Sequence, residues 1–467
     1  MPLLLHALLR ALLLLLLGAA GSSTAPTTFE AAAAAAAAAE TRLRKPAGAG
    51  ADAQLRRADE LESLADARSL MRERAASVSA REEALALRLA AGTPAARTAV
   101  ALAAELQASG DYAAALRVVA EAQQRVAAAT APTAALPGLG PLLLRLEANL
   151  LDCRGDTVAA LGRVARARKA ERAAQPAAAP SASDTLQHVR LLRKVLLSDA
   201  LSAALPPAIL RGLREEWARQ QRDLVGAGPW RDALQLPKVY VAGLSARPWH
   251  SVAAHFPLVA PLEALLVAAR PALLAELREL ERRGLTEREE ECIHGGGGGG
   301  GAQWPGAWTT YMVNAHWRPR LDADGCSLDT PAACALLRDA AALGVARVVR
   351  GGYSVVSARA HLHPHCGLTN AQLKMHLGLE VPVDAATGLG CARIRVGNET
   401  RRWREGAVLF FDDSFEHEVW HECDGGAPRS VFQLVIAHPE LDALVASGAA
   451  RDPFPRVGAP GARGGEL

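Results

Sequence analysis

The spacing of apolar residues changes near residue 226. From 54 to 225, apolar positions recur at intervals of three and four among strong helix formers, which predicts α-helices. After 226, tryptophans, β-branched pairs and Gly/Pro punctuation become frequent, as in a β-sandwich or jelly roll. The chain is therefore expected to be multidomain, with a helical region followed by a β-rich domain. The expected strands cover 308–313, 353–358, 373–381, 392–396, 407–411 and 431–437.

Two segments of the helical region share one layout. Each has an apolar helix, a Gly-Asp turn and a second helix, with the turns at Gly110-Asp111 and Gly155-Asp156. Such pairs resemble tetratricopeptide units, although the interval between the two glycines exceeds the usual ~34 residues. An unspecialised helical bundle is the alternative. A repeat architecture would offer a surface for a protein partner.

Segments outside these two regions have simpler compositions. Residues 1–22 combine Arg10 with an apolar run, so a signal peptide, a signal anchor in the membrane and an organellar transit peptide are the competing interpretations. Residues 23–53 are Ala-, Thr- and Gly-rich and are expected to form a linker. The glycine run 295–301 is expected to be a flexible insertion and 446–467 a disordered tail.

Overall composition excludes several classes of protein. The 467 residues are 50% apolar and 22% charged, unlike a wholly disordered chain or a disulfide scaffold. The formal net charge is only +3, with Lys and Arg interleaved among acids, so no nucleic-acid surface is expected.

Histidines cluster in the β-rich half. Seven of the thirteen lie from His361 onward, and His361, His363 and His365 alternate, so they would share one face of a strand. His417 follows an apolar run that ends in two aspartates. A single histidine is more often structural than ligating, but this cluster favours a metal site, and imidazole suits Fe, Zn or Cu.

Three stretches around these histidines resemble a known family. They are HPHCGLTNAQLKMHLGLEVP, RVGNETRRWREGAVLFFDDSFEHEVW and HPEL, with weaker similarity in VYVAGLSARPWH. Together they resemble the aspartyl/asparaginyl β-hydroxylase domain of the Fe(II)- and 2-oxoglutarate-dependent dioxygenases. The resemblance implies a double-stranded β-helix (jelly roll, cupin-like) catalytic domain over 226–445. This family also carries tetratricopeptide-like helices before its catalytic domain.

The resemblance implies a metal site with two histidine ligands. His365 and His417 fall where the family holds iron, and Gly367 occupies the position of the carboxylate in the common facial triad. Water or 2-oxoglutarate would then complete the coordination. Asp412 and Asp413 are expected in turn or supporting roles rather than as iron ligands.

The resemblance also implies a pocket for 2-oxoglutarate. Arg429 corresponds to the residue that pairs with the distal carboxylate, with Ser354 beside it as a hydroxyl donor. Lys374 and His376 would meet the other end of this cosubstrate. Most relatives have Arg at the position of Lys374, so this chain keeps the charge but loses the planar fork.

The activity implied is O2-dependent β-hydroxylation of Asp or Asn side chains in peptide or protein substrates. Relatives that hydroxylate Asp carry Arg at the position of Gln372, so a different peptide or a lipid-like substrate is an alternative, as is drift at an exposed position. A non-catalytic scaffold with a relic jelly roll and a zinc-binding cupin are further alternatives. Retention of the motif residues argues against the relic, and the Arg429–Ser354 pair against zinc alone.

Cysteine usage bears on the compartment. The seven cysteines cannot all pair, and Cys326 and Cys334 enclose a loop that resembles a disulfide-bonded loop of the family. That disulfide is expected, and it fits the lumen of the endoplasmic reticulum or the secretory pathway. Cys366 follows His365 and is expected to be a buried thiol rather than a ligand. Asn398 begins a glycosylation sequon.

Overall fold

A computed structural model describes most of the chain: residues 29–45, 50–91, 93, 95–128, 139–174, 182–227, 230–289, 306–315, 317–423 and 426–454. The expected signal or anchor segment 1–22, the glycine run 295–301 and most of the expected tail lie outside these residues.

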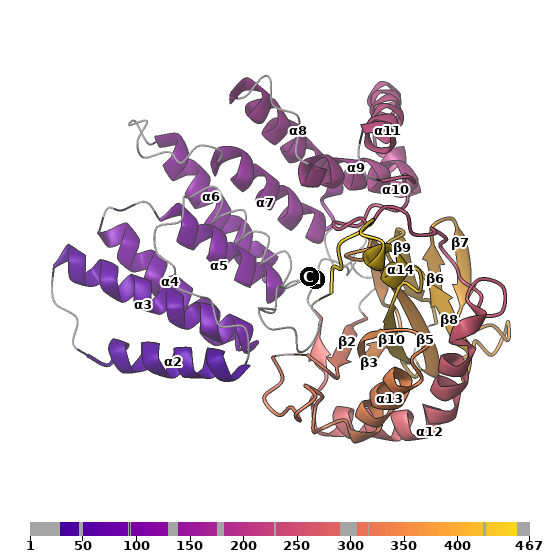
Figure 1. Ribbon diagram of the computed structural model, residues 1–467. Helices are drawn as coiled ribbons and strands as arrows, with labels where there is room; N and C mark the ends of the chain where they lie inside the picture. Colours follow the sequence, from indigo (N-terminus) through magenta and orange to yellow (C-terminus); the bar gives the residue numbers. More distant parts are fainter. Residues whose placement is uncertain are drawn as a thin grey trace.

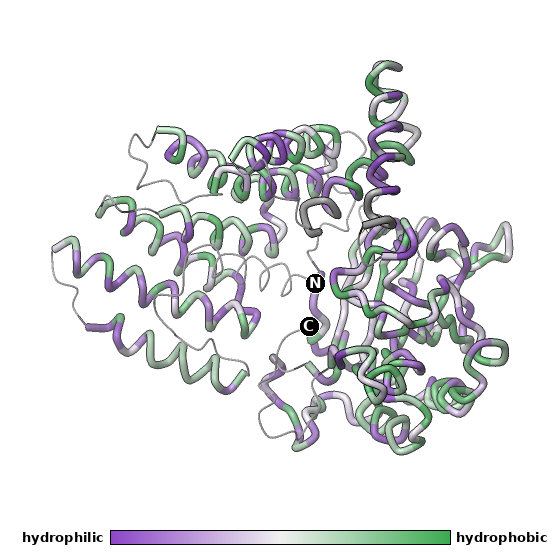
Figure 2. The backbone as a smooth tube through the Cα atoms, turned by 45° about the horizontal axis from the view of Figure 1, so that its top comes forward, coloured by the Kyte–Doolittle hydropathy of each residue, from purple (hydrophilic) through white to green (hydrophobic). Residues whose placement is uncertain are grey.

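The first half of the described chain is helical, as predicted. Its helices lie side by side in a fan next to the β-rich domain (Figure 1), and apolar and polar stretches alternate along them (Figure 2). Gly110 and Gly155 have φ of 78° and 88°, a left-handed conformation that closes the hairpins α5–α6 and α7–α8 at the expected turns. The helices are α2 (Phe29–Leu43), α3 (Ala51–Leu70), α4 (Arg74–Ala90), α5 (Ala96–Ala108), α6 (Tyr112–Ala128), α7 (Leu139–Cys153), α8 (Thr157–Ala174), α9 (Ala182–Leu197), α10 (Asp199–Ala203) and α11 (Pro207–Ala227).

Helix α2 lies within the segment that was expected to be a linker. Its Ala32, Ala36 and Ala39 are buried, and the helix packs against α3. A helix built from a run of alanine has no polar face opposite an apolar one, so its sequence pattern does not show which side packs against another helix. Its small side chains nevertheless let two helix backbones approach closely, so one side of a uniform run is buried.

The second half contains two antiparallel sheets, consistent with the predicted jelly roll. The order is β1-β2-β3-β10-β5-β8 in the six-stranded sheet and β4-β9-β6-β7 in the four-stranded sheet. All six expected strands are present. The strands are β1 (Glu287–Arg288), β2 (Trp308–Met312), β3 (Val348–Val356), β4 (His361–His365), β5 (Gln372–Glu380), β6 (Ala392–Val396), β7 (Glu399–Arg402), β8 (Val408–Phe411), β9 (His417–His421) and β10 (Arg429–Ala437).

Two helices cover the outer face of the six-stranded sheet, α12 (Ala260–Arg282) and α13 (Pro331–Ala342). The segment Pro257–Arg282 is the one stretch of the described chain with the length and apolar composition of a membrane span. Its buried leucines, however, belong to the core shared with β3, β5 and β10: Leu262, Leu266, Leu273, Leu277 and Leu280. Alternate residues of these strands face the four-stranded sheet, and the site lies on that inner side. A short helix, α14 (Leu441–Ala446), follows β10.

Candidate active site

The three alternating histidines of β4 do not share a face. His361 pairs with Trp420 and Leu362 with Val419, but His365 pairs with His417, so the register of β4 against β9 shifts between Leu362 and His365. Such a bulge inserts one residue and re-aims the side chain that follows it. The expectation of a common face, which assumed a regular strand, is therefore wrong.

His361 and His363 lie on the outer face of the four-stranded sheet, where they belong to a network of side chains. The His361 ring stacks on Trp420, with 5.4 Å between centroids, and its Nε2 lies 2.7 Å from Glu418 Oε1. The His363 ring lies 4.4 Å from that of His361. The bulge thus separates a structural histidine pair from the third histidine.

On the inner side, His365 and His417 meet, with ring centroids 4.1 Å apart. The Nδ1 of His365 donates to the carbonyl of His363 at 2.7 Å, and that of His417 donates to the carbonyl of Phe415 at 3.0 Å. These bonds place the lone pair on Nε2 in both rings, which is the usual arrangement of metal-binding histidines. Burial and the neighbouring His365 hold the pKa of His417 well below its usual range.

The residues expected to bind 2-oxoglutarate come from three adjacent strands of the six-stranded sheet. Ser354 lies on β3, Lys374 and His376 on β5, and Arg429 on β10. Val431 pairs with Ser354, which brings Arg429 to the same end of β3. Arg429 Nη1 donates to the carbonyl of Ser354 at 3.2 Å.

A continuous line of rings joins this group to the histidine pair. The guanidinium of Arg429 lies 4.5 Å from the Trp403 ring centroid, and Trp403 stacks on His376 at 6.2 Å. His376 contacts Phe411 at 4.8 Å, and Phe411 lies 6.3 Å from His417. Burial, followed by the charges of Lys374 and Arg429, lowers the pKa of His376 well below its usual range. The structure therefore brings all of these expected site residues together.

Arg429 is a buried cation. Its side chain is among the largest fully buried ones, and burial lowers its pKa to about 9. No Asp or Glu in the described chain forms an ion pair with it, and its Nε has no hydrogen-bond partner. A buried guanidinium without a carboxylate is costly. An anionic ligand with a carboxylate would relieve that cost.

Asp413 occupies the space next to Gly367. A Cβ on Gly367 would clash with Asp413 Oδ2, so no side chain fits there. The same oxygen accepts a hydrogen bond from Lys374 Nζ at 2.9 Å. Burial favours protonated Asp413, yet Lys374 and His417 hold its pKa below the ordinary value. An anionic carboxylate thus lies beside the histidine pair, although no three His, Cys, Asp or Glu residues of the described chain are arranged to hold a metal.

Asp412 has a different role from its neighbour. It accepts hydrogen bonds from the Ser414 backbone at 2.9 Å and from Gln235 Nε2 at 3.0 Å, which shape the turn before β9. Burial raises its pKa to about 8.

Sequence reasoning missed three residues of the site. Trp308 Nε1 donates to Ser354 Oγ at 3.0 Å, so a tryptophan fixes that hydroxyl. Trp403 lies over Arg429, as described above. Arg350 shares the inner face of β3 with Ser354, feels the charge of Asp413, and has its pKa lowered by burial. The alternation of β3 would have indicated Arg350, whereas the tryptophan contacts depend on folding.

Gln372 is buried rather than exposed, which corrects the interpretation of drift at a surface position. It lies two residues before Lys374 on the same face of β5, and its Nε2 has no hydrogen-bond partner in the structure. A buried amide nitrogen without an acceptor is a potential donor to a ligand.

Two disulfide bonds lie among the described residues of the β-rich domain. Cys326 is bonded to Cys334, the pair that the resemblance implied, and Cys391 is bonded to Cys423, a pair that it did not imply. Cys366 is the one free cysteine of the described chain, and burial raises the pKa of its thiol.

Comparison with known proteins concerns the β-rich half of the chain. Residues 269–439 match the family described as aspartyl/asparaginyl beta-hydroxylase. The C-terminal part of the chain is a domain of this family. Aspartyl/asparaginyl beta-hydroxylase of Mus musculus is 40% identical over 136 residues, which are 29% of this chain and 17% of the relative. The Homo sapiens protein of that name is 34% identical over 203 residues, 43% and 24% of the two chains.

A third relative of the domain is aspartate beta-hydroxylase domain-containing protein 2 of Mus musculus. It is 40% identical over 91 residues, which are 19% of this chain and 24% of the relative. The chain thus spans about a quarter or less of the length of these relatives. The family assignment therefore applies to the β-hydroxylase domain.

Proposed function

We propose that this chain is an Fe(II)- and 2-oxoglutarate-dependent dioxygenase that β-hydroxylates Asp or Asn side chains of peptide or protein substrates. One observation carries the proposal: two histidines with Nε2 lone pairs meet, and a line of rings connects them to a buried arginine that lacks a carboxylate partner among the described residues. The first feature suits a divalent metal and the second a dicarboxylate.

The residues present fit these groups. His365 and His417 would hold the iron, and the hydrogen bonds of Nδ1 to backbone carbonyls keep both rings in the required tautomer. Arg429 and Ser354 would bind one carboxylate of 2-oxoglutarate, and Lys374 and His376 would face its other end. Iron, 2-oxoglutarate and O2 together supply the oxidising power to insert oxygen into a C–H bond while the cosubstrate becomes succinate and CO2.

The protein's own part is to bind, orient and exclude water. Trp308 fixes the Ser354 hydroxyl, and Trp403 and Phe411 surround the inner site with apolar surface. Asp413 holds Lys374 by an ion pair, so the ammonium keeps its place before the cosubstrate arrives. Low dielectric around these groups strengthens each charged contact.

Succinate release tests the proposal. The parent chain, His365→Ala and His417→Ala are compared with added Fe(II) and 2-oxoglutarate over peptides that contain Asp, Asn or Pro. We expect succinate and a mass increase of one oxygen only with the parent chain and an Asp or Asn peptide. Absence of turnover with every peptide would favour the non-catalytic scaffold.

A different substrate for the same chemistry is the second candidate. Gln372 favours it, because this buried amide offers a neutral donor where Asp-hydroxylating relatives are expected to offer a cation. A preference for Asn over Asp peptides that reverses in Gln372→Arg would support this assignment. Turnover of a substrate without Asp or Asn, such as a lipid-like molecule, would establish the broader alternative.

We further propose an oxidising compartment, the lumen of the endoplasmic reticulum or the secretory pathway. Two disulfides within the β-rich domain support this location, because such bonds are rare in the cytosol. Asn398 lies exposed at the turn between β6 and β7, where a glycan would be accessible. A glycosidase-sensitive shift in mobility that disappears in Asn398→Gln would support lumenal residence.

The helical region is proposed to bind a protein partner.

A further inference from the structure

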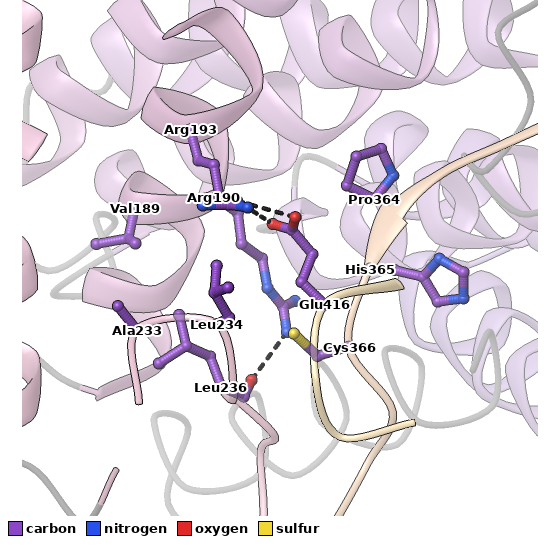
Figure 3. A pocket seen from close by; sticks show the side chains of 10 residues that line it. All are labelled: Val189, Arg190, Arg193, Ala233, Leu234, Leu236, Pro364, His365, Cys366 and Glu416. Carbon is purple, nitrogen blue, oxygen red and sulfur yellow. Dashed lines mark hydrogen bonds and ion pairs between the residues drawn. The ribbon is translucent and has the colours of Figure 1, made fainter. Parts of the chain in front are cut away.

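Helix α9 packs against both segments that carry the paired histidines. Cys366 directly follows His365, and Glu416 directly precedes His417. Arg190 and Arg193 of α9 line one small cavity together with these two residues (Figure 3). In the same view the His365 ring projects away from the cluster. The helical region therefore contacts the histidine segments from behind.

Arg193 of α9 forms an ion pair with Glu416. Its Nε lies 2.8 Å from the carboxylate of Glu416, and the two side chains are only 14% and 9% exposed. Arg395 of β6 approaches the same carboxylate at 2.9 Å. Glu416 is thus held between the helical region and the four-stranded sheet. A bridge with this little exposure is weakly screened, unlike an ion pair on the surface.

Arg190 and its neighbours hold the other histidine segment. Its Nη2 donates to the carbonyl of Leu236 at 3.2 Å, and the guanidinium also interacts with the Cys366 thiol. Val189, Trp230 and Leu236 bury Cys366 in one cluster. The cavity among them holds only about 10 Å³, roughly one water. Such close packing leaves little room for either segment to move.

We infer that Arg193 is a positioning residue for the metal site, acting through Glu416. This inference rests on the proposed function. Neighbouring residues of an extended chain point to opposite sides, so anchoring the Glu416 side chain on α9 fixes the direction of His417. The packing of Cys366 in its apolar cluster likewise fixes the direction of the His365 side chain. The helical region therefore sets the separation of the two ligands, and the β-rich domain alone does not complete the site.

Cobalt binding to the full chain tests this role without relying on turnover. Co(II) is titrated into the metal-free parent chain, Arg193→Gln, Arg193→Lys and Glu416→Gln, and the visible absorption spectrum reports affinity and coordination. We expect Arg193→Gln and Glu416→Gln to weaken Co(II) binding by about 10-fold or more, the effect typical of losing a partner behind a metal ligand. Arg193→Lys retains the charge and should recover most of the affinity.

Arg72→Gln is the matched control. It removes another ion pair between the helical region and the β-rich domain, also 2.8 Å long, but made to Glu287 of β1 and not to a histidine segment. Its Co(II) affinity should equal that of the parent chain. Thermal melting of the metal-free proteins separates loss of folding from loss of the site, and Glu416→Gln decides the question if Arg193→Gln is poorly folded.

The outcomes distinguish this inference from the proposed function. Equal Co(II) affinity and spectra in parent, Arg193→Gln and Glu416→Gln would overturn the positioning role and leave the proposed function intact. Equal losses in Arg193→Gln and Arg72→Gln would also overturn it, because the effect would then be general to the domain contact. A parent chain that binds no Co(II) would overturn both.

Discussion

The six-stranded sheet holds the groups assigned to the cosubstrate, whereas the four-stranded sheet holds both histidines assigned to the metal. Ser354, Lys374, His376 and Arg429 lie on β3, β5 and β10, and the histidines lie on β4 and β9. The first set combines a hydroxyl, two cationic side chains and a buried imidazole, whereas each histidine of the second set has its Nδ1 bonded to a backbone carbonyl. Metal binding and carboxylate binding are therefore separable by mutation.

The largest effect is expected on the four-stranded sheet. His417→Ala removes one of the two protein ligands, so Co(II) affinity should fall by more than about 100-fold, beyond the usual cost of losing an outer partner. Equilibrium titration measures the loss. His361→Ala is the control, because this histidine lies on the outer side of the bulge and its loss should leave affinity within a few-fold. Equal losses would contradict the separation of the two faces.

The two disulfides allow a comparison of stability. Cys391–Cys423 closes a separation of 32 residues across the four-stranded sheet, and Cys326–Cys334 closes one of 8 beside the six-stranded sheet. Loop-closure entropy predicts losses of about 3–4 and about 2–3 kcal/mol in the free energy of unfolding when each pair is changed to serine. Urea denaturation measures both. A larger loss for the shorter loop would mean that chain entropy does not dominate.

Arg429→Gln should affect the cosubstrate but not the metal. A hydrogen bond to a charged group contributes about 1.5–3 kcal/mol, so the KM for 2-oxoglutarate should rise about 10- to 100-fold. Co(II) affinity should remain that of the parent chain. Arg278→Gln, which removes an exposed ion pair on α12, is the control for a lost surface charge. An unchanged KM would exclude Arg429 as the carboxylate anchor.

His250, beside β8 of the six-stranded sheet, should make stability depend on pH. Its ring contacts Phe256 and Phe410, neither ring nitrogen has a hydrogen-bond partner, and burial lowers its pKa from 6.5 to about 3. The unfolded chain binds more protons between these values, so stability is lost as pH falls from about 6.5 toward 3. At pH 5 the loss is about 2 kcal/mol.

His250→Phe should remove that part of the pH dependence. The aromatic contacts remain but nothing titrates, so the free energy of unfolding should fall less between pH 7 and pH 5 than in the parent chain. Urea denaturation at the two pH values measures the difference. Identical slopes in parent and variant would show that His250 does not contribute.

The smallest effect is expected for Lys374→Arg. Arginine restores the planar fork that relatives of the resembled family carry, and it retains the charge opposite Asp413. The KM for 2-oxoglutarate should fall by no more than about threefold, under 1 kcal/mol. Lys374→Gln, which removes the charge, is the comparison and should raise the KM. A rise of the KM in both variants would indicate that the ion pair between Lys374 and Asp413 determines the affinity for 2-oxoglutarate.

Much of this architecture was predictable because its signals are local. Three- and four-residue periodicity indicated the helices, and runs of apolar and β-branched residues indicated the six longer or more apolar strands. Three other strands, β1, β7 and β9, were missed because they are short and rich in charged residues or histidine, whereas β4 was considered only through its alternating histidines. Helix α2 was missed because a run of alanine has no polar face to contrast with an apolar one.

The site was predictable to the level of residues but not of contacts. The motifs indicated His365, His417 and Arg429, and the alternation of β5 was sufficient to group Gln372 with Lys374. The register shift in β4 depends on pairing with β9, and the approach of Asp413 to Gly367 depends on how two distant turns meet. Neither relation can be predicted from the residues next to each other in the sequence.

The register shift in β4 also makes the bulge itself a requirement. Without it, regular pairing continued from Leu362 and Val419 would bring Pro364 opposite His417, and the imidazole of His365 would turn to the outer face. Substitutions that keep the bulge would preserve the meeting of the two rings. In this stretch a change that lets the strand pair regularly is therefore more harmful to the protein than a change in side chain.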